Sequence, residues 1–180
     1  MAAGGIQFRP AAAADVEGIA AVHVRAWQFA YPGIVPETTL RSLTVEARSR
    51  IWAQARLGRR PPERPVFVAA ADDVIVGMTA GGTPRDRDPP YDAEIYAINI
   101  DPAYWRRGIG RGLFLRCAEH LAAIGARSLY LWDFVANLRR GASYESLGGR
   151  PLEDRVHHLD MDGVEVPEIA FGWSEIPVPA

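Results

Sequence analysis

The residues of this chain best suited to bind an anion lie between Trp105 and Leu113. This segment reads Trp-Arg-Arg-Gly-Ile-Gly-Arg-Gly-Leu, so three glycines and three arginines lie close together. Glycine has no Cβ to keep a phosphate away from backbone N–H groups, and guanidinium groups pair with phosphate through forked hydrogen bonds. We expect the segment to join a strand at Ala93–Ile100 to a helix that runs to Ile124, so the positive end of the helix dipole points to the same place. The segment therefore predicts a site for a diphosphate-bearing ligand.

Three classes of ligand use glycine-rich loops, and the spacing of the glycines separates them. A nucleoside-triphosphate loop ends in Gly-Lys-Ser/Thr, and no such ending follows Gly112. A dinucleotide loop needs a third glycine three residues after the second, but Gly110 is followed by Arg111, Gly112 and Leu113. A dinucleotide-dependent oxidoreductase is therefore disfavoured. Coenzyme A is the third class.

The segment Ala93–Tyr104, with the glycine-rich loop after it, resembles the acyl-CoA-binding motif of the Gcn5-related N-acetyltransferase (GNAT) superfamily. In that family the loop reads Gln/Arg-x-x-Gly-x-Gly/Ala and follows a proline that ends the fourth strand. Trp105 stands where Gln or Arg is usual, and Arg106 stands where many relatives carry glycine. The resemblance implies acetyl-CoA as co-substrate, with backbone groups of Ile98 to Ile100 holding its thioester carbonyl and pantetheine arm. The implied cofactor-binding residues here are Ile98, Asn99, Ile100, Arg106, Arg107, Gly108, Ile109, Gly110, Arg111 and Gly112.

A second stretch, residues 137–149, resembles another signature of the family, Asn-x-x-Ala-x-x-Phe-Tyr-Glu-x-x-Gly-Phe. The matching residues are Asn137, Tyr144, Glu145 and Gly148, whereas Arg140, Ser143 and Gly149 replace apolar residues of the signature. The resemblance implies that Asn137, Arg140 and Tyr144 contact the cofactor, and that Tyr144 protonates the coenzyme A sulfur. The alternative for Tyr144 is an aromatic ring packed beneath its helix.

Acetyl transfer to an amine also requires a base, because an ammonium group must lose a proton before it attacks. Glu94 is the candidate, since it begins the strand that leads to the cofactor loop and resembles the catalytic glutamate of the family's histone acetyltransferases. Strand alternation predicts Glu94, Tyr96, Ile98 and Ile100 on one face, directed to the substrate cleft. The alternative for Glu94 is a solvated residue at a strand end.

Three aromatic residues are candidates for the acceptor pocket, which the family builds from the first helices and the fifth strand. They are Trp27, Tyr31 and Trp132, and with Glu94 they form the predicted substrate-binding set. The alternative for each is a place in the hydrophobic core. His157 and His158 are adjacent in an expected strand and so face opposite sides, which makes them poor joint metal ligands. No metal is expected.

The composition of the chain favours one compact domain, expected over residues 1–180. The 180 residues are 48% hydrophobic and 23% charged, and the formal net charge is −2, which predicts neither a nucleic-acid nor a membrane partner. Cys117 is the single cysteine, and its helical spacing with Leu113, Phe114 and Leu121 predicts a core position rather than a nucleophile. The first residues lack the basic start and apolar run of a secretory signal, so a cytoplasmic location is expected.

Hydrophobic periodicity predicts the elements that must position these residues. Strands are expected at 6–9, 66–71, 74–82, 93–100, 128–132, 151–160 and 164–173. Helices are expected at 15–29, 36–57 and 137–147, and from the glycine-rich loop to residue 124. Residues 81–91, rich in Gly, Pro and Asp, are expected to form a loop that overhangs a site. This order predicts an α/β (α+β mixed) fold with a mostly antiparallel central sheet of about seven strands flanked by about four helices, which is also the order of the GNAT fold.

The predicted function is transfer of the acetyl group of acetyl-CoA to a primary amine of a small molecule or protein. Direct attack within a ternary complex is expected, because no activated cysteine or serine is placed to form a covalent intermediate. The alternative is a non-catalytic acyl-CoA-binding sensor with the same fold, which the altered residues Ser143 and Gly149 leave open. The acceptor, and whether the chain forms a homodimer, stay open at this stage.

Overall fold

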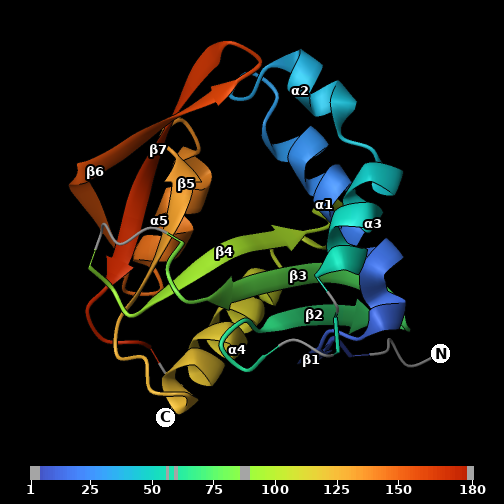
Figure 1. Cartoon of the computed structure of the whole chain (residues 1–180), viewed down its shortest axis with the longest axis horizontal. Coiled ribbons are helices and arrows are strands. Elements are labelled where there is room, and N and C mark those ends of the chain that lie inside the picture. Colours follow the sequence, from blue (N-terminus) through green and yellow to red (C-terminus); the bar gives the residue numbers. More distant parts are fainter. Residues whose placement is uncertain (1–4, 56, 59–60, 86–89, 178–180) are drawn as a thin grey trace.

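A computed structural model describes residues 5–55, 57–58, 61–85 and 90–177, except for the side chain of Arg140. Its centre is a seven-stranded sheet in the order β1-β2-β3-β4-β5-β7-β6, in which only the β4–β5 pair is parallel among the described strands. The sheet confirms the predicted fold class (Figure 1). The strands are β1 (Gln7–Pro10), β2 (Val66–Ala71), β3 (Val74–Gly82), β4 (Ala93–Ile100), β5 (Leu129–Phe134), β6 (Arg150–Met161) and β7 (Val164–Trp173).

Five α-helices flank the sheet in the described part of the chain, one more than predicted. They are α1 (Val16–Ala30), α2 (Glu37–Ser42), α3 (Val45–Gln54), α4 (Ile109–Ala123) and α5 (Leu138–Glu145), with short 3-10 turns at Ala13–Asp15 and Pro102–Tyr104. The helical region expected at 36–57 is divided because Leu43 is extended and Thr44 caps α3, its side chain accepting from the Ala47 N–H at 3.2 Å. Such a cap satisfies an N–H that would otherwise lack an acceptor.

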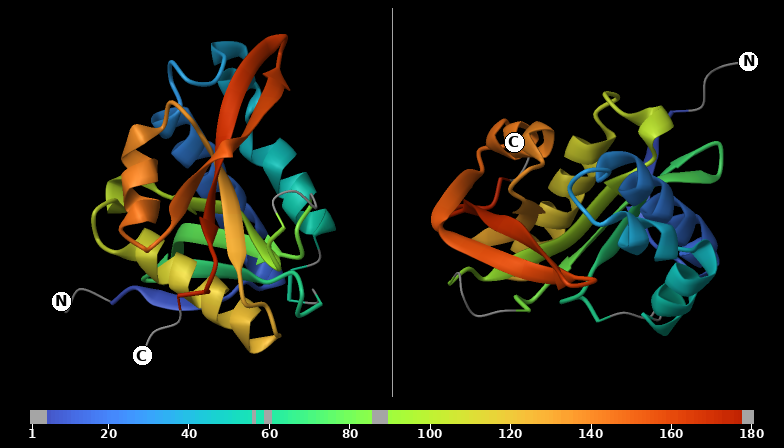
Figure 2. Two further views of the ribbon diagram at one scale, coloured as in Figure 1. Left: turned by 90° about the vertical axis from the view of Figure 1, so that its left-hand side faces the viewer. Right: turned by 90° about the horizontal axis from the view of Figure 1, so that it is seen from above.

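The two faces of the sheet carry different helices, as alternation along β2 shows. Val68 and Ala70 pack with Ile19 of α1, whereas Ala69 and Ala71 belong to the cluster around Phe114 of α4. The sheet therefore has α1 on one face and α4 on the other (Figure 2). Cys117 lies in the α4 cluster with no exposed surface, and burial raises the pKa of its thiol to about 12. The predicted core position of this cysteine is confirmed.

The alternation predicted along β4 is wrong in its second half, because the strand contains a β-bulge. Ala80 of β3 pairs with Ala97, and Gly81 pairs with Ile95, so Tyr96 is passed over. An extra residue moves every later side chain to the other face. Ile98 therefore packs in the α4 cluster together with Ile95, and it does not share a face with Glu94.

The parallel strands β4 and β5 diverge after a short paired region, which creates an opening in the sheet (Figure 1). Pairing ends where Ile95 meets Leu131, while β5 continues beside β7 to Phe134. The hairpin of β6 and β7 extends beyond the other strands to α2, where Thr38 and Thr39 donate hydrogen bonds to Asp162 at 2.9 and 2.6 Å. The region where the strands diverge is thus held between the hairpin and the helices of the N-terminal half.

Candidate active site

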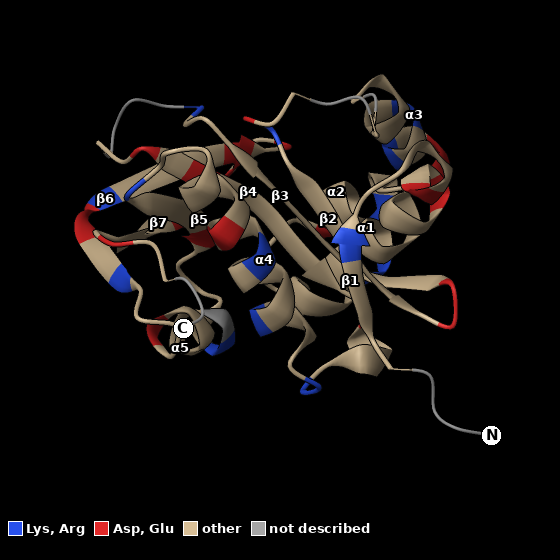
Figure 3. Ribbon diagram, turned by 90° about the horizontal axis from the view of Figure 1, so that it is seen from below, with Lys and Arg blue, Asp and Glu red and all other residues tan. Residues whose placement is uncertain are grey.

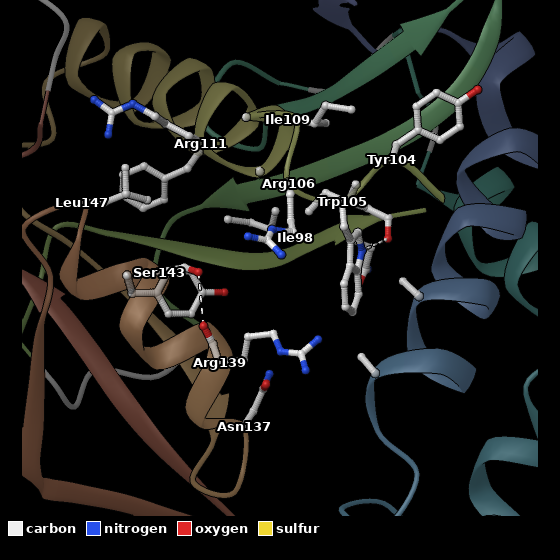
Figure 4. A pocket seen from close by; sticks show the side chains of 18 of the residues that line it. Ile98, Tyr104, Trp105, Arg106, Ile109, Arg111, Asn137, Arg139, Ser143 and Leu147 are labelled. Atoms are coloured by element: carbon white, nitrogen blue, oxygen red, sulfur yellow. Dashed lines mark hydrogen bonds between the residues drawn. The ribbon is translucent and has the colours of Figure 1, made fainter. Parts of the chain in front are cut away.

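A cavity of about 710 Å³ lies where β4 ends and α4 begins, with α1 and α5 forming its other walls (Figure 4). The structure brings most of the predicted cofactor residues to this one cavity. Those lining it are Ile98, Asn99, Ile100, Arg106, Gly108, Ile109, Gly110, Arg111, Asn137 and Tyr144. The strand, the glycine-rich loop and the second motif therefore all border this cavity.

The first turn of α4 supplies the groups that suit an anion. Gly108 caps the helix in a left-handed conformation, φ 76°, and no side chain caps the turn. The first N–H groups of a helix have no acceptor within it, and the helix dipole places partial positive charge there. Arg106 and Arg111 line the same cavity, and α4 and the loop before it carry basic residues (Figure 3). This end of the cavity is therefore suited to phosphate groups.

Arg106 has an unusual backbone conformation for a residue with a side chain. Its φ is 62°, in the left-handed region, where a residue other than glycine is strained by about 1 kcal/mol. This observation gives a physical reason for glycine at the same point of the family motif. In this chain the strain accompanies a guanidinium group that lines the cavity.

Among the predicted cofactor residues whose side chains the structure describes, Arg107 and Gly112 do not line the cavity. The Arg107 guanidinium lies over the ring of Tyr104, 4.9 Å from its centroid. The Gly112 N–H donates to the Gly108 carbonyl at 2.9 Å, and a Cβ on Gly112 would lie 2.4 Å from the ring of Phe8. Gly112 thus permits close packing of α4 on β1 instead of leaving a free N–H for phosphate. The predicted role of Arg140 lies outside the described side chains.

Sequence reasoning missed Arg139, which lines the cavity opposite Arg106 (Figure 4). Its guanidinium lies 5.9 Å from the ring centroid of Trp105, whose indole N–H donates to the Ile100 carbonyl at 3.0 Å. Trp105 is thereby fixed at the cavity wall. The run Arg139-Arg140 in the second motif was the available signal, but the family pattern directed attention to Arg140 alone.

A second, smaller cavity of about 140 Å³ lies between the diverging strands, lined by β4 from Ile95 to Asn99 and by β5 from Leu131 to Phe134. All three aromatic residues predicted for the acceptor pocket line it: Trp27, Tyr31 and Trp132. Trp132 stacks on His157 with ring centroids 3.9 Å apart, and Trp27 meets Tyr31 edge-on at 5.0 Å. The three predicted aromatic residues therefore surround one small space, which Glu94 does not line.

Tyr144 lines both cavities, together with Tyr31, Ile98 and Asn99. Its side chain is largely buried, and its ring contacts Phe171 and Trp173 with centroids 5.5 and 6.2 Å away. Packing in the core and a catalytic role are compatible for Tyr144. Its ring contacts core residues, and the same residue lines both cavities.

Glu94 is buried, with 1% of its side chain exposed, and its carboxylate is fully occupied. Arg85 donates to it from the backbone N–H at 2.8 Å, from Nε at 2.9 Å and from Nη2, and the Tyr130 hydroxyl donates at 3.2 Å. Glu94 is not among the residues that line either cavity. The alternative reading, a solvated residue at a strand end, is therefore wrong, and the role of Glu94 as the base stays a prediction.

Two acidic residues line the smaller cavity instead, and sequence reasoning singled out neither. Asp133 of β5 accepts hydrogen bonds from the Asn137 side chain at 3.1 and 3.3 Å. Glu168 of β7 has its pKa raised to about 7, first by burial and then by the negative charges of Asp133 and Glu94, which Arg85 partly offsets. Glu168 therefore changes its charge near neutral pH.

His23 is a third unpredicted residue of the smaller cavity. Its Nδ1 lies 3.5 Å from Asn99 Nδ2, and its Nε2 is buried with no hydrogen-bond partner among the described residues. Burial lowers the pKa of this imidazole to about 3, so the ring is neutral at ordinary pH. Within the described residues no group of three or more potential ligands could hold a metal ion, and no described helix is long and apolar enough to cross a membrane.

The family model described as "Acetyltransferase (GNAT) family" matches residues 24–148, from α1 to the end of the second motif. The chain belongs to this acetyltransferase family.

Relatives with similar sequences and structures agree with this assignment. An uncharacterised N-acetyltransferase of Bacillus subtilis, YuaI, is 29% identical over 172 residues, covering 95% of this chain and 94% of its own. The N-alpha-acetyltransferase RimI of Mycobacterium tuberculosis is 32% identical over 116 residues, covering 63% of this chain and 71% of its own. A Salmonella typhimurium acetyltransferase solved with acetyl-CoA has a similar fold, with a TM-score of 0.69 at 18% identity, covering 97% and 96% of the two chains.

Proposed function

We propose that this protein transfers the acetyl group of acetyl-CoA to a primary amine of a small molecule or protein, by direct attack of the amine on the thioester. The observation that carries this proposal is that the two cavities share Tyr144, one at the phosphate-suited end of α4 and the other among aromatic and acidic residues. A donor in the larger cavity and an acceptor in the smaller one would meet at that residue.

The residues of the larger cavity fit the chemistry of coenzyme A. The α4 N-terminus, Arg106 and Arg111 suit its diphosphate, and the end of β4 at Ile98 to Ile100 suits an extended amide-bearing chain. Asn137 at the start of α5 completes the wall. When bound, the acetyl thioester supplies an activated acyl carbon, and the protein supplies position and proton transfer.

Tyr144 is proposed as the acid that protonates the departing thiolate. Model phenols and model thiols have similar pKa values, about 10 and about 8.5, so a tyrosine is chemically suited to pass a proton to a departing thiolate. Direct attack is favoured over a covalent intermediate because Cys117 is buried with its pKa raised to about 12, which keeps it a thiol.

The smaller cavity supports an amine as acceptor. Aromatic faces from Trp27 and Trp132 attract a cation, and the carboxylates of Asp133 and Glu168 line the same space. These acidic side chains would oppose an anionic acceptor. A small-molecule amine is the first choice, because the cavity is only about 140 Å³, and a protein amine is the second.

The test is release of free thiol from acetyl-CoA in the presence of a panel of mono- and polyamines, amino acids and peptides with free N-termini. Thiol release that depends on an amine, with the acetylated amine identified by mass spectrometry, is the expected result. Acetyl-CoA binding by calorimetry without thiol release for any amine would favour the alternative, a sensor with the same fold. Absence of acetyl-CoA binding would overturn both.

A further inference from the structure

We propose that Glu168, on strand β7, is the carboxylate that removes the proton from the acceptor ammonium group. This inference rests on the proposed acetyl transfer and assigns its base to a residue outside both sequence motifs. It separates two acidic residues by role: Glu168 exchanges the proton, and Glu94 is a fixed charge that positions Arg85.

The position of Glu168 in the sheet directs it to the acceptor side. Glu168 pairs directly with Phe134 of β5 and with His157 of β6, and directly paired residues share a face. Trp132 lies two residues before Phe134 and therefore on that same face. Glu168 and Tyr144 both line the cavity of about 140 Å³, so the proposed base and acid border one small space.

The Glu168 carboxylate can accept a proton without first losing a hydrogen bond, whereas the Glu94 carboxylate is already hydrogen-bonded. Within the described parts of the chain, no hydrogen bond or ion pair engages Glu168. Glu94 instead accepts from Arg85 and from the Tyr130 hydroxyl, and the cavity does not include it. The oxygens of Glu94 are thus already engaged by Arg85 and Tyr130, away from the cavity in which an acceptor amine would lie.

The groups around Glu168 tune it for this task. Asp133 on β5 and Glu94 on β4 raise its pKa, Arg85 after β3 lowers it, and burial is the largest cause of the value of about 7. His157 on β6 is its direct neighbour across the strands and is stacked against Trp132. His23 on α1 is neutral and adds no charge. A base whose pKa lies near the working pH is partly in its ionised form at that pH and still binds a proton well.

The proton balance of the reaction follows from these positions. The ammonium R–NH₃⁺ gives one proton to the Glu168 carboxylate, and the lone pair of R–NH₂ forms the new N–C bond to the thioester carbon. Collapse of the tetrahedral adduct breaks the C–S bond, and the Tyr144 hydroxyl gives its proton to the thiolate. The phenolate then recovers a proton from the nitrogen of the new amide, and Glu168 releases its proton to water. The sum is one amide, one thiol and one proton.

The experiment compares Glu168→Gln with Glu165→Gln, a matched control at an exposed position of the same strand. For the best amine found, Glu168→Gln should lower kcat/KM roughly a hundredfold near neutral pH, and the loss should shrink as rising pH deprotonates the amine in solution. Its affinity for acetyl-CoA should be unchanged, and Glu168→Asp should recover part of the rate. Glu165→Gln should behave as wild type.

A wild-type rate and pH profile for Glu168→Gln would overturn the assignment, while continued turnover of the wild type would leave the proposed acetyl transfer intact. A second measurement does not depend on activity or on the folding of a variant. Carbon-13 NMR titration of glutamate carboxyls should show Glu168 titrating near pH 7 in the wild type. An ordinary value near 4.5 would contradict the proposal.

Discussion

Arg85 holds the Glu94 carboxylate through three hydrogen bonds, one from its backbone N–H and two from its guanidinium. The guanidinium also lies over the ring of Tyr96, 4.9 Å from its centroid, at the point where β4 is bulged. Arg85 belongs to the segment expected to overhang a site, and Glu94 ties its start to the sheet. The pair therefore connects the loop after β3 to the strand that leads to both cavities.

Glu94→Gln should destabilise the protein by about 2 kcal/mol, because it replaces a buried acceptor of charged hydrogen bonds and turns an amide NH₂ toward the donors of Arg85. Arg85 is 61% exposed and can regain water, which limits the loss. Urea unfolding measures the effect, with exposed Glu165→Gln as control. Activity should fall by a similar factor at every pH. A loss confined to neutral pH would instead identify Glu94 as the base.

Tyr144→Phe should fold and bind acetyl-CoA with unchanged affinity, because it removes one hydroxyl and keeps the ring contacts with Phe171 and Trp173. Its kcat should fall roughly a hundredfold if the hydroxyl protonates the thiolate. Steady-state rates with amine, alongside calorimetry for acetyl-CoA, separate the two effects. Tyr91→Phe, at a tyrosine outside both cavities, is the control. An unchanged kcat for Tyr144→Phe would remove this residue from the chemistry.

Gly110→Asp should weaken acetyl-CoA binding at least tenfold, about 1.4 kcal/mol, because it places a negative charge at the anion-suited turn. The fold should survive: a Cβ on Gly110 would meet only Ile100 Cδ1, at 3.4 Å, and aspartate is favourable in the first turn of a helix. Ala123→Asp adds the same charge at the far end of α4. Calorimetry showing equal affinity for both variants would contradict the phosphate assignment.

The pH dependence of stability offers a test of Glu168 that needs no substrate. Folding raises the pKa of this carboxyl from 4.5 to about 7, so between these values the folded state keeps a proton that the unfolded state has released. The free energy of unfolding of the wild type, relative to Glu168→Gln, should therefore fall as pH rises through this window and level off above it. Thermal unfolding at about pH 5 and about pH 8 should show the Gln variant gaining relative stability at the higher pH. Equal differences at both pH values would contradict the raised pKa.

The sequence predicted the order of elements and marked residues that border the larger cavity, because both depend on local signals. The glycine-rich loop, the helix after it and the motif at Asn137 and Tyr144 each have a recognisable spacing, and they converge in one cavity. The turn between the strands expected at 66–71 and 74–82 lies at Asp72 and Asp73, which both have the positive φ angles of a tight turn.

The smaller cavity was only partly predictable, because its remaining features arise from long-range pairing. The bulge at Tyr96 leaves no mark on the apolar pattern of β4, so a simple alternation misplaced Ile98. No sequence motif marks Glu168, which reaches the smaller cavity through the pairing of β7 with Phe134 of β5. The partner of Glu94 could not be read from the sequence either, since Arg85 reaches it by way of a loop.

The central claim is that an acetyl group passes directly from the donor cavity to an amine in the smaller cavity, with Tyr144 between them. The most direct measurement follows a carbon-13-labelled acetyl group by mass spectrometry of both protein and amine, with acetyl-CoA supplied alone and then together with the amine. The account predicts an unlabelled protein in both cases, and labelled amine in proportion to the thiol released when both substrates are present. A labelled protein formed from acetyl-CoA alone that passes its label to the amine, or thiol release without labelled amine, would contradict it.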